Sequence, residues 1–256
     1  MDKMNEKIGL FDSGIGGLSI LKELLKIMPN ENYYYYQDSF HNPYGNKSEE
    51  EILKLAQETV EILLKEKCKI IVIACNTATT ACMKKLRELY PNIIFVGTVP
   101  AIKVAYDNNS RNTILLSTPY TTKSKRVQEL LHLYTDGEHR IINVSGEDLA
   151  HLIDINAKKE IYDLLLKILS PYKGKVDSLI MGCTHYSLIK KEILEVLPGI
   201  TLYDGSVGVS KEVYHQLEMN HLLNPSSLKG TVEIFNNKSD DYVKRSFEIL
   251  NNNSIL

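Results

Sequence analysis

Two short segments of this chain end an apolar run on a cysteine that polar residues follow directly. In the first, residues 70–74 lead into Cys75-Asn76-Thr77, and in the second, residues 178–182 lead into Cys183-Thr184-His185. A strand of a parallel sheet that runs into a helix presents its last side chains at the carboxyl edge of the sheet, where open α/β folds bind ligands. If two such edges face each other, the chain holds two thiols across one pocket.

Apolar runs rich in β-branched and aromatic residues alternate with amphipathic stretches along the chain. The expected strands are 8–11, 33–36, 70–74, 93–96, 113–117, 141–144, 179–182 and 232–235, and the clearest covering helices are 48–65 and 161–169. This alternation predicts βαβ units and mostly parallel sheets. We therefore expect an α/β protein.

A chain of 256 residues can form two compact domains. The best candidates for crossings between them are two stretches of small residues, 97–100 and 204–208. We expect residues 1–98 plus 208–256 to form an N-terminal α/β domain with Asp12, Ser13 and Cys75. Residues 99–207 then form a second α/β domain with Cys183 and His185.

Charge and cysteine content narrow the class of protein. The chain has 30 Lys and Arg against 32 Asp and Glu, mixed throughout, so no nucleic-acid or membrane partner is expected. The charged N-terminus carries no apolar leader, and no run is long enough to span a bilayer. The four cysteines lack the paired spacing of secreted domains. We expect a cytoplasmic protein with reduced thiols.

Each cysteine also has a simpler interpretation, because a free cysteine is commonly just a small buried residue. For Cys75 and Cys183, the position at a strand end before a helix favours a reactive role, since a helix N-terminus stabilises a thiolate. The spacing of seven between Cys68, Cys75 and Cys82 could suggest a metal cluster. Zinc sites normally use tighter pairs, so we expect no metal.

The loop that begins with Asp12-Ser13-Gly14 follows an expected strand and opens an expected helix. Its glycines form an incomplete dinucleotide fingerprint, and Asp38 could serve as the acid that contacts a ribose, so a nucleotide site remains an alternative. A second possibility is a polar hook, in which Asp12 and Ser13 bind an ammonium group. A third is that either residue only caps the helix.

Other polar residues are ambiguous by themselves. Ser48 and Glu51 have the spacing of a capping box. Thr118, Thr121 and Ser124 are hydroxyls that could bind a carboxylate, and His185 could be a core or capping histidine.

Taken together, four motifs resemble the signature of the glutamate racemase family: Asp12-Ser13-Gly14, Pro43-Tyr44-Gly45, Cys75-Asn76-Thr77-Ala78 and Gly182-Cys183-Thr184-His185-Tyr186. They occur in the order of the family and extend over nearly the whole chain. The resemblance implies two α/β domains with mostly parallel sheets and the active site in the cleft between them. It also implies interconversion of L- and D-glutamate without a cofactor, which supplies D-glutamate for peptidoglycan.

The resemblance further implies a role for each matching residue. Cys75 would deprotonate D-glutamate with help from Asp12, and Cys183 would deprotonate L-glutamate with help from His185. The substrate contacts carried over from the family are Asp12 and Ser13 for the amino group, Asn76, Thr77 and Thr184 for the α-carboxylate, and Tyr44, Gly45 and Thr121 for the side-chain carboxylate. The resemblance also implies that the protein needs no pyridoxal phosphate and forms a homodimer.

Two positions depart from the family pattern: Tyr120 stands where glycine is usual, and Asp154 where many members carry glutamate. Tyr120 could change the shape of the pocket mouth. The shorter side chain of Asp154 leaves open whether this residue assists catalysis. Two other functions stay open. One is a racemase for aspartate or another acidic amino acid, and the other is a non-catalytic amino-acid sensor on the same fold.

Overall fold

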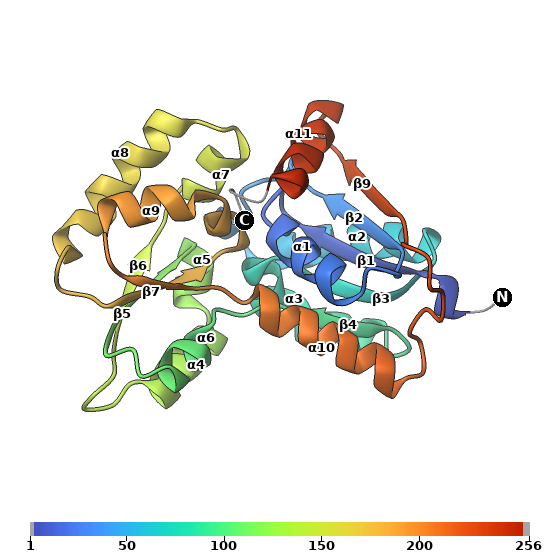
Figure 1. The fold of residues 1–256 in the computed structure, drawn as a ribbon, viewed down its shortest axis with the longest axis horizontal. Coiled ribbons are helices and arrows are strands. Elements are labelled where there is room, and N and C mark those ends of the chain that lie inside the picture. The colour runs from blue at the N-terminus through green and yellow to red at the C-terminus, as the bar shows by residue number, and fades with distance from the viewer. Residues whose placement is uncertain (1–2, 253–256) are drawn as a thin grey trace.

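Two parallel sheets lie side by side in the computed structural model, which describes residues 3–252 (Figure 1). The larger sheet has the strand order β4-β3-β1-β2-β9, and the smaller has the order β6-β5-β7-β8. Their strands are β1 (Lys7–Asp12), β2 (Tyr33–Gln37), β3 (Cys68–Ile73), β4 (Ile94–Gly97) and β9 (Val232–Asn236), and β5 (Asn112–Ser117), β6 (Arg140–Ser145), β7 (Ser178–Gly182) and β8 (Thr201–Tyr203).

The α/β class with parallel sheets is confirmed, and each expected strand is present to within two residues at either end. One strand was missed, β8 (Thr201–Tyr203), which pairs with β7 at the edge of the smaller sheet. It has only three residues, so it offers too short an apolar pattern for detection from sequence. Met1 and Asp2, part of the N-terminal segment considered above, lie outside the described residues.

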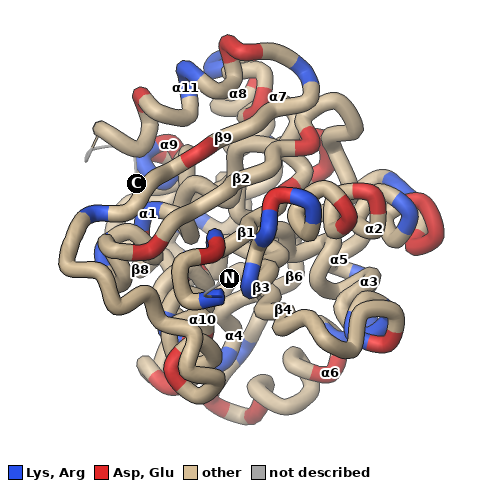
Figure 2. Tube along the Cα trace, turned by 90° about the vertical axis from the view of Figure 1, so that its right-hand side faces the viewer, with Lys and Arg blue, Asp and Glu red and all other residues tan. Residues whose placement is uncertain are grey.

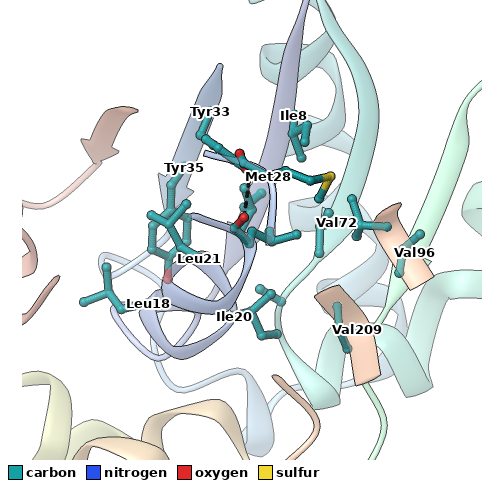
Figure 3. Close-up of a cluster of buried hydrophobic side chains, with 14 of the residues drawn as sticks. Ile8, Leu18, Ile20, Leu21, Met28, Tyr33, Tyr35, Val72, Val96 and Val209 are labelled. Carbon is teal, nitrogen blue, oxygen red and sulfur yellow. Dashed lines mark hydrogen bonds between the residues drawn. The ribbon is translucent and has the colours of Figure 1, made fainter. Parts of the chain in front are cut away.

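Helices cover both faces of the larger sheet. On one face lie α1 (Leu18–Ile27), α10 (Ser206–Met219) and α11 (Asp240–Asn251), and on the other α2 (Glu49–Lys65) and α3 (Asn76–Leu89). Successive strand residues point to opposite faces, so Ile8 and Leu10 join one apolar cluster while Phe11 joins the other. Figure 3 shows the first cluster, where the buried Tyr33 hydroxyl donates to the Met28 carbonyl at 2.8 Å.

The smaller sheet is covered in the same way. One cluster packs α7 (Leu149–Asp154), α8 (Lys158–Leu169), α9 (Lys190–Val196) and the 3₁₀ helix η4 (Thr184–Ile189) against it. The other uses α4 (Ile102–Asp107) and α6 (Lys125–Tyr134). The remaining helices are α5 (Pro119–Lys123), η1 (Lys3–Asn5), η2 (Tyr44–Asn46) and η3 (Ser170–Tyr172).

The chain passes between the two sheets where small residues were noted. β4 of the larger sheet ends at Gly97, and the next strand, β5, belongs to the smaller sheet. β8 of the smaller sheet ends at Tyr203, and α10, which starts at Ser206, packs on the larger sheet. The larger sheet and its helices therefore combine both ends of the described chain.

Local signals near the surface also agree with the structure. Ser48 and Glu51 form the expected capping box at the start of α2. Lysines, arginines and acids are interspersed along the chain (Figure 2). Within residues 3–252, no helix is both long and apolar enough to cross a membrane.

Candidate active site

Cys75 lies two residues beyond the end of β3, after Ala74, and forms the N-cap of α3. Its Sγ accepts a hydrogen bond from the Ala78 N–H at 3.5 Å, and its thiol donates to the Ser13 hydroxyl at 3.8 Å. The residue is only 5% exposed. Burial raises the pKa of the Cys75 thiol well above its ordinary value, and the nearby Asp12 carboxylate raises it further, while the Ala78 N–H acts in the opposite direction.

Asp12 ends β1, next to β3, and therefore reaches the same sheet edge as Cys75. Its Oδ1 accepts the Ser13 N–H at 2.6 Å, and its Oδ2 accepts the Thr184 hydroxyl at 2.8 Å. The carboxylate is fully buried, and burial raises its pKa. The capping interpretation of Asp12 and Ser13 was wrong, because the N-cap of α1 is Gly17 and no side chain caps it.

Cys183 directly follows β7 of the smaller sheet and precedes η4. The sulfur of Cys183 contacts the His185 side chain, with Sγ 3.9 Å from Nδ1 of the ring. The other ring nitrogen, Nε2, lies 3.2 Å from Oδ1 of Asp154. Burial by itself lowers the pKa of His185, but the interactions with Asp154, Cys183 and Asp12 outweigh it and raise the pKa well above its ordinary value.

The loop after β1 joins the two halves of the site. The Ile15 N–H donates to Asp154 Oδ1 at 3.1 Å, and Thr184 donates to Asp12 across the same contact. The approach is close: a Cβ built on Gly16 would lie 2.5 Å from the backbone nitrogen of His185. Glycine is needed at position 16 for the two sheet edges to meet at this distance.

A second contact between the halves consists of hydroxyl groups. Thr77 Oγ1 lies 2.9 Å from Thr118 Oγ1 and 3.3 Å from Thr121 Oγ1. Gly45 lies against Thr118, because a Cβ there would be 2.7 Å from the Cβ of Thr118. Thr77 follows Cys75 in α3, whereas Thr118 and Thr121 follow β5, so both sheets contribute to this hydroxyl cluster.

Tyr44 is buried in η2, and its hydroxyl donates to Asp38 Oδ2. Asp38 also accepts hydrogen bonds from His41 and Asn237. These contacts occupy the carboxylate with groups of the chain itself. The use of Asp38 as a ribose-binding acid is therefore not supported by its position.

Buried acceptors without a partner gather near the cysteines. Within residues 3–252, the buried side-chain oxygens that have no hydrogen-bond partner are Asn42 Oδ1, Asn76 Oδ1, Asn143 Oδ1 and Asp154 Oδ2. Asn76 is next to Cys75, while Asn42 and Asp154 both contact His185. Buried polar groups are normally paired, so unpaired acceptors beside Cys75 and His185 fit a site where a bound molecule supplies hydrogen-bond donors.

The other two cysteines lie away from this arrangement. Cys68 starts β3, and Cys82 lies within α3, where its thiol donates to the Ala78 carbonyl at 2.8 Å. All four cysteines are free. In the described part of the chain, no three His, Cys, Asp or Glu side chains are grouped so that they could hold a metal ion.

The structure brings the expected catalytic residues Asp12, Cys75, Cys183 and His185 into one site, and Ser13, Asn76, Thr77 and Thr184 adjoin them. Sequence reasoning missed Asn42 and the Ile15 N–H, and it gave Asp154 no settled role. The neighbour of Asn42 in the sequence, Pro43, marked a turn but not its side-chain contact. A backbone N–H that acts at 139 residues' separation leaves no mark in the sequence.

Comparisons with known proteins agree with one another. Residues 18–207 match the family model described as Asp/Glu/Hydantoin racemase. A glutamate racemase of Clostridium botulinum is 39% identical over 98% of this chain and 99% of its own length. The fold superposes with a TM-score of 0.82 on a glutamate racemase isoform of Bacillus anthracis, at 27% identity over 95% of this chain and 92% of that one.

A third relative was crystallised with ligands. The Escherichia coli glutamate racemase, in complex with L-glutamate and the activator UDP-MurNAc-ala, has a TM-score of 0.82 and 29% identity, covering 96% of this chain and 95% of that one.

Proposed function

Because this chain belongs to the Asp/Glu/Hydantoin racemase family and, within it, to the glutamate racemases, we propose that it inverts glutamate by a two-cysteine, two-base proton transfer. The observation that carries this mechanism is the pair of strand-end cysteines. Cys75 and Cys183 come from different sheets, and each has its own supporting groups.

Inversion at a carbon that bears one hydrogen requires two groups on opposite faces. In the direction from D to L, the Cys75 thiolate takes the α-proton, so the Cα–H bond breaks and an S–H bond forms. The Cys183 thiol then gives its proton to the other face of the same carbon. The opposite direction exchanges the roles, and a thiol suits both because it can act as the acid when protonated and as the base when ionised.

The environment of Cys75 supports its use as a base. The α-proton of an amino acid is very weakly acidic, so a stronger base removes it faster. Burial next to Asp12 raises the pKa of Cys75 and makes its thiolate more basic. The Ala78 N–H holds the sulfur in place at the start of α3.

Cys183 depends on an imidazole instead. We propose that His185 exchanges a proton with Cys183 through Nδ1, while Asp154 at Nε2 stabilises the charged ring. The raised pKa of His185 supports this role, because it favours the imidazolium beside a thiolate. Asp154, although shorter than glutamate by one methylene, is within reach of the ring.

The substrate contacts are proposed on the same footing. Asp12 and Ser13 hold the amino group, and Asn76, Thr77 and Thr184 hold the α-carboxylate. Tyr44, Gly45 and Thr121 hold the side-chain carboxylate. The support is their position, since the hydroxyl cluster of Thr77, Thr118 and Thr121 lies where the two sheets meet.

We also propose the division into an N-terminal domain, 1–98 plus 208–256, and a second domain, 99–207. The passage of the chain between sheets after β4 and after β8 supports it. Supply of D-glutamate for peptidoglycan, a cytoplasmic location and a homodimer are proposals that rest on the family. Light scattering of the purified protein tests the dimer.

The experiment that tests the function is proton NMR of L-glutamate and of D-glutamate in D₂O with the purified, reduced protein, followed by chiral analysis. We expect loss of the α-proton signal and inversion from both enantiomers, without added cofactor. Aspartate serves as the control substrate, and it should remain unchanged.

Each alternative predicts a different spectrum. Faster exchange of aspartate than of glutamate would favour a racemase for the shorter acid. Saturable binding of glutamate without exchange from either enantiomer would contradict the catalytic proposal and favour the amino-acid sensor.

A further inference from the structure

Arg245 of α11 reaches from the larger-sheet half of the molecule to the end of α7 in the other half. Its Nη1 donates to the main-chain carbonyl of Asp154 at 2.6 Å, and its Nη2 donates to that of Ile153 at 2.9 Å. Figure 1 shows α11 next to α7. No motif in the sequence singles out this arginine, and the mechanism proposed above does not use it.

The two carbonyls are the last of α7, a helix of six residues. The final carbonyls of a helix have no partner within it, and a basic side chain can satisfy them. So short a helix has little stability of its own. A planar guanidinium that donates to two successive carbonyls fixes both the position and the rotation of the helix end.

The held residue, Asp154, is also the residue that contacts His185. Its Oδ1 accepts the Ile15 N–H and lies 3.2 Å from His185 Nε2, while its Oδ2 has no partner among the described residues. The larger-sheet half therefore holds Asp154 twice, at the main chain by Arg245 and at the carboxylate by Ile15. Burial lowers the pKa of Arg245, and the negative charge of Asp154 opposes this effect.

We propose that Arg245 is a positioning residue for proton transfer at Cys183, acting through Asp154 and His185. By docking the end of α7 on α11, it aligns Asp154 with the imidazole when the two halves of the molecule meet. This role rests on the proposed function. Through this contact α11 affects the proton transfer at Cys183. The proton transfer at Cys75 does not depend on it.

Initial rates alone cannot isolate this role. L- and D-glutamate are enantiomers with an equilibrium constant of one, so kcat/KM has to be equal in the two directions for every variant. A label on the α-carbon separates the steps. Deuterium in L-glutamate reports transfer to Cys183, and deuterium in D-glutamate reports transfer to Cys75.

The variant Arg245→Met removes both donors while keeping an apolar stem. We expect kcat/KM to fall roughly 10- to 100-fold, the scale of loss when a catalytic group is misplaced by about 1 Å. The isotope effect on kcat/KM should increase with [2-²H]-L-glutamate, because transfer at Cys183 becomes more rate-limiting. With [2-²H]-D-glutamate it should decrease toward one. Arg245→Lys, which retains one cationic donor, should give an intermediate result.

Two controls distinguish positioning from general damage. Lys244→Met removes the same charge from the neighbouring, exposed position of α11 and should change neither isotope effect. In an Asp154→Asn background, Arg245→Met should cost little further activity, since residues that act as a unit are not additive. If Arg245→Met does not fold, as judged by circular dichroism, Arg245→Lys carries the test.

Isotope effects in a folded Arg245 variant that stay at the values of the unaltered protein for both enantiomers, or full additivity with Asp154→Asn, would overturn the proposal. Absence of racemisation by the unaltered protein would instead contradict the proposed function. The two failures are therefore distinct.

Discussion

The Cys75 edge and the Cys183 edge begin with the same sequence pattern and reach different environments. Cys75 caps a helix of 14 residues, and its sulfur is held by a main-chain N–H and a serine hydroxyl next to a buried carboxylate. Cys183 precedes a 3₁₀ helix whose start its side chain does not cap, and its sulfur is paired with His185, which in turn contacts Asp154.

The difference shows that a strand-end thiol can be supported in two ways. At Cys75 the main-chain support is local, since α3 begins at the next residue and its Ala78 N–H donates to the sulfur, and the Ser13 hydroxyl comes from the same half of the molecule. At Cys183 it depends on Asp154, 31 residues from His185 in the sequence, and on an N–H from the opposite half of the molecule. We therefore expect the Cys183 edge to be more sensitive to the contact between the halves.

The largest effect should come from removing either thiol. Cys75→Ser and Cys183→Ser should each lower racemisation roughly 10²- to 10⁴-fold, because a hydroxyl is a much poorer base than a thiolate at neutral pH. The two variants should differ in exchange. Cys75→Ser should first lose exchange of the α-proton of D-glutamate, and Cys183→Ser that of L-glutamate, as measured by NMR in D₂O.

Cys82→Ala provides the control for the thiol variants, because Cys82 is a buried cysteine of α3 whose thiol donates to the Ala78 carbonyl in its own helix. It should retain racemisation. If Cys82→Ala lost as much racemisation activity as Cys75→Ser, this result would contradict a special role of the strand-end thiols.

A smaller loss should follow from Gly16→Ala, which places a methyl group 2.5 Å from the His185 backbone nitrogen. The loop after β1 then has to move away from η4. This movement lengthens the hydrogen bond between Ile15 and Asp154 and the one between Thr184 and Asp12. We expect kcat/KM to fall roughly tenfold or more. In the isotope test, the Cys183 step should become the more rate-limiting one.

Gly208→Ala is the matched control, since a Cβ at Gly208 meets no atom within 4 Å. It lies inside α10, where alanine is the better helix former. Unchanged kinetics in Gly208→Ala together with unchanged kinetics in Gly16→Ala would contradict the close approach as a requirement for activity.

At the Cys75 edge, the buried carboxylate of Asp12 should lower the free energy of unfolding. Burial raises the pKa of Asp12, so the folded state favours the protonated acid, and the free energy of unfolding declines as pH rises from 3.8 through the raised pKa. Asp12→Asn lacks this dependence. We expect it to be inactive, and more stable than the unaltered protein above the raised pKa by on the order of 1 kcal/mol.

Urea unfolding of both proteins at a series of pH values measures this difference. The gap should narrow as pH falls toward 3.8, where the carboxyl of Asp12 is protonated in the folded state. A gap that widens toward low pH would mean that the hydrogen bonds from Ser13 and Thr184 outweigh burial.

The smallest effect should come from Tyr120, which lies in α5. Its hydroxyl donates to Glu49 at 3.3 Å near the surface, and burial together with the Glu49 charge raises its pKa to about 12. Tyr120→Phe should change the unfolding free energy by less than about 0.5 kcal/mol. Its KM for glutamate should stay within twofold, and a larger shift would place the hydroxyl in the substrate path.

Much of the architecture could be predicted from short-range patterns. Apolar runs of four or more residues located every strand except β8, and the small residues near 97–100 and 204–208 lie where the chain changes sheets. The position of Cys75 at a helix start followed from the polar residues after it. Each of these signals depends on residues that are neighbours in the sequence. Short sequence segments are therefore sufficient to predict these features.

What the tertiary structure decided was the set of partners around each thiol. The sequence by itself determined that Asp12, Cys75 and Cys183 lie at the ends of strands or just beyond them in parallel sheets, because strand-to-helix switches are local. It did not determine that Asp154 meets His185, or that Ile15 and Arg245 hold Asp154. Such contacts join residues far apart in the chain, and they exist only when two separately built sheets pack edge to edge.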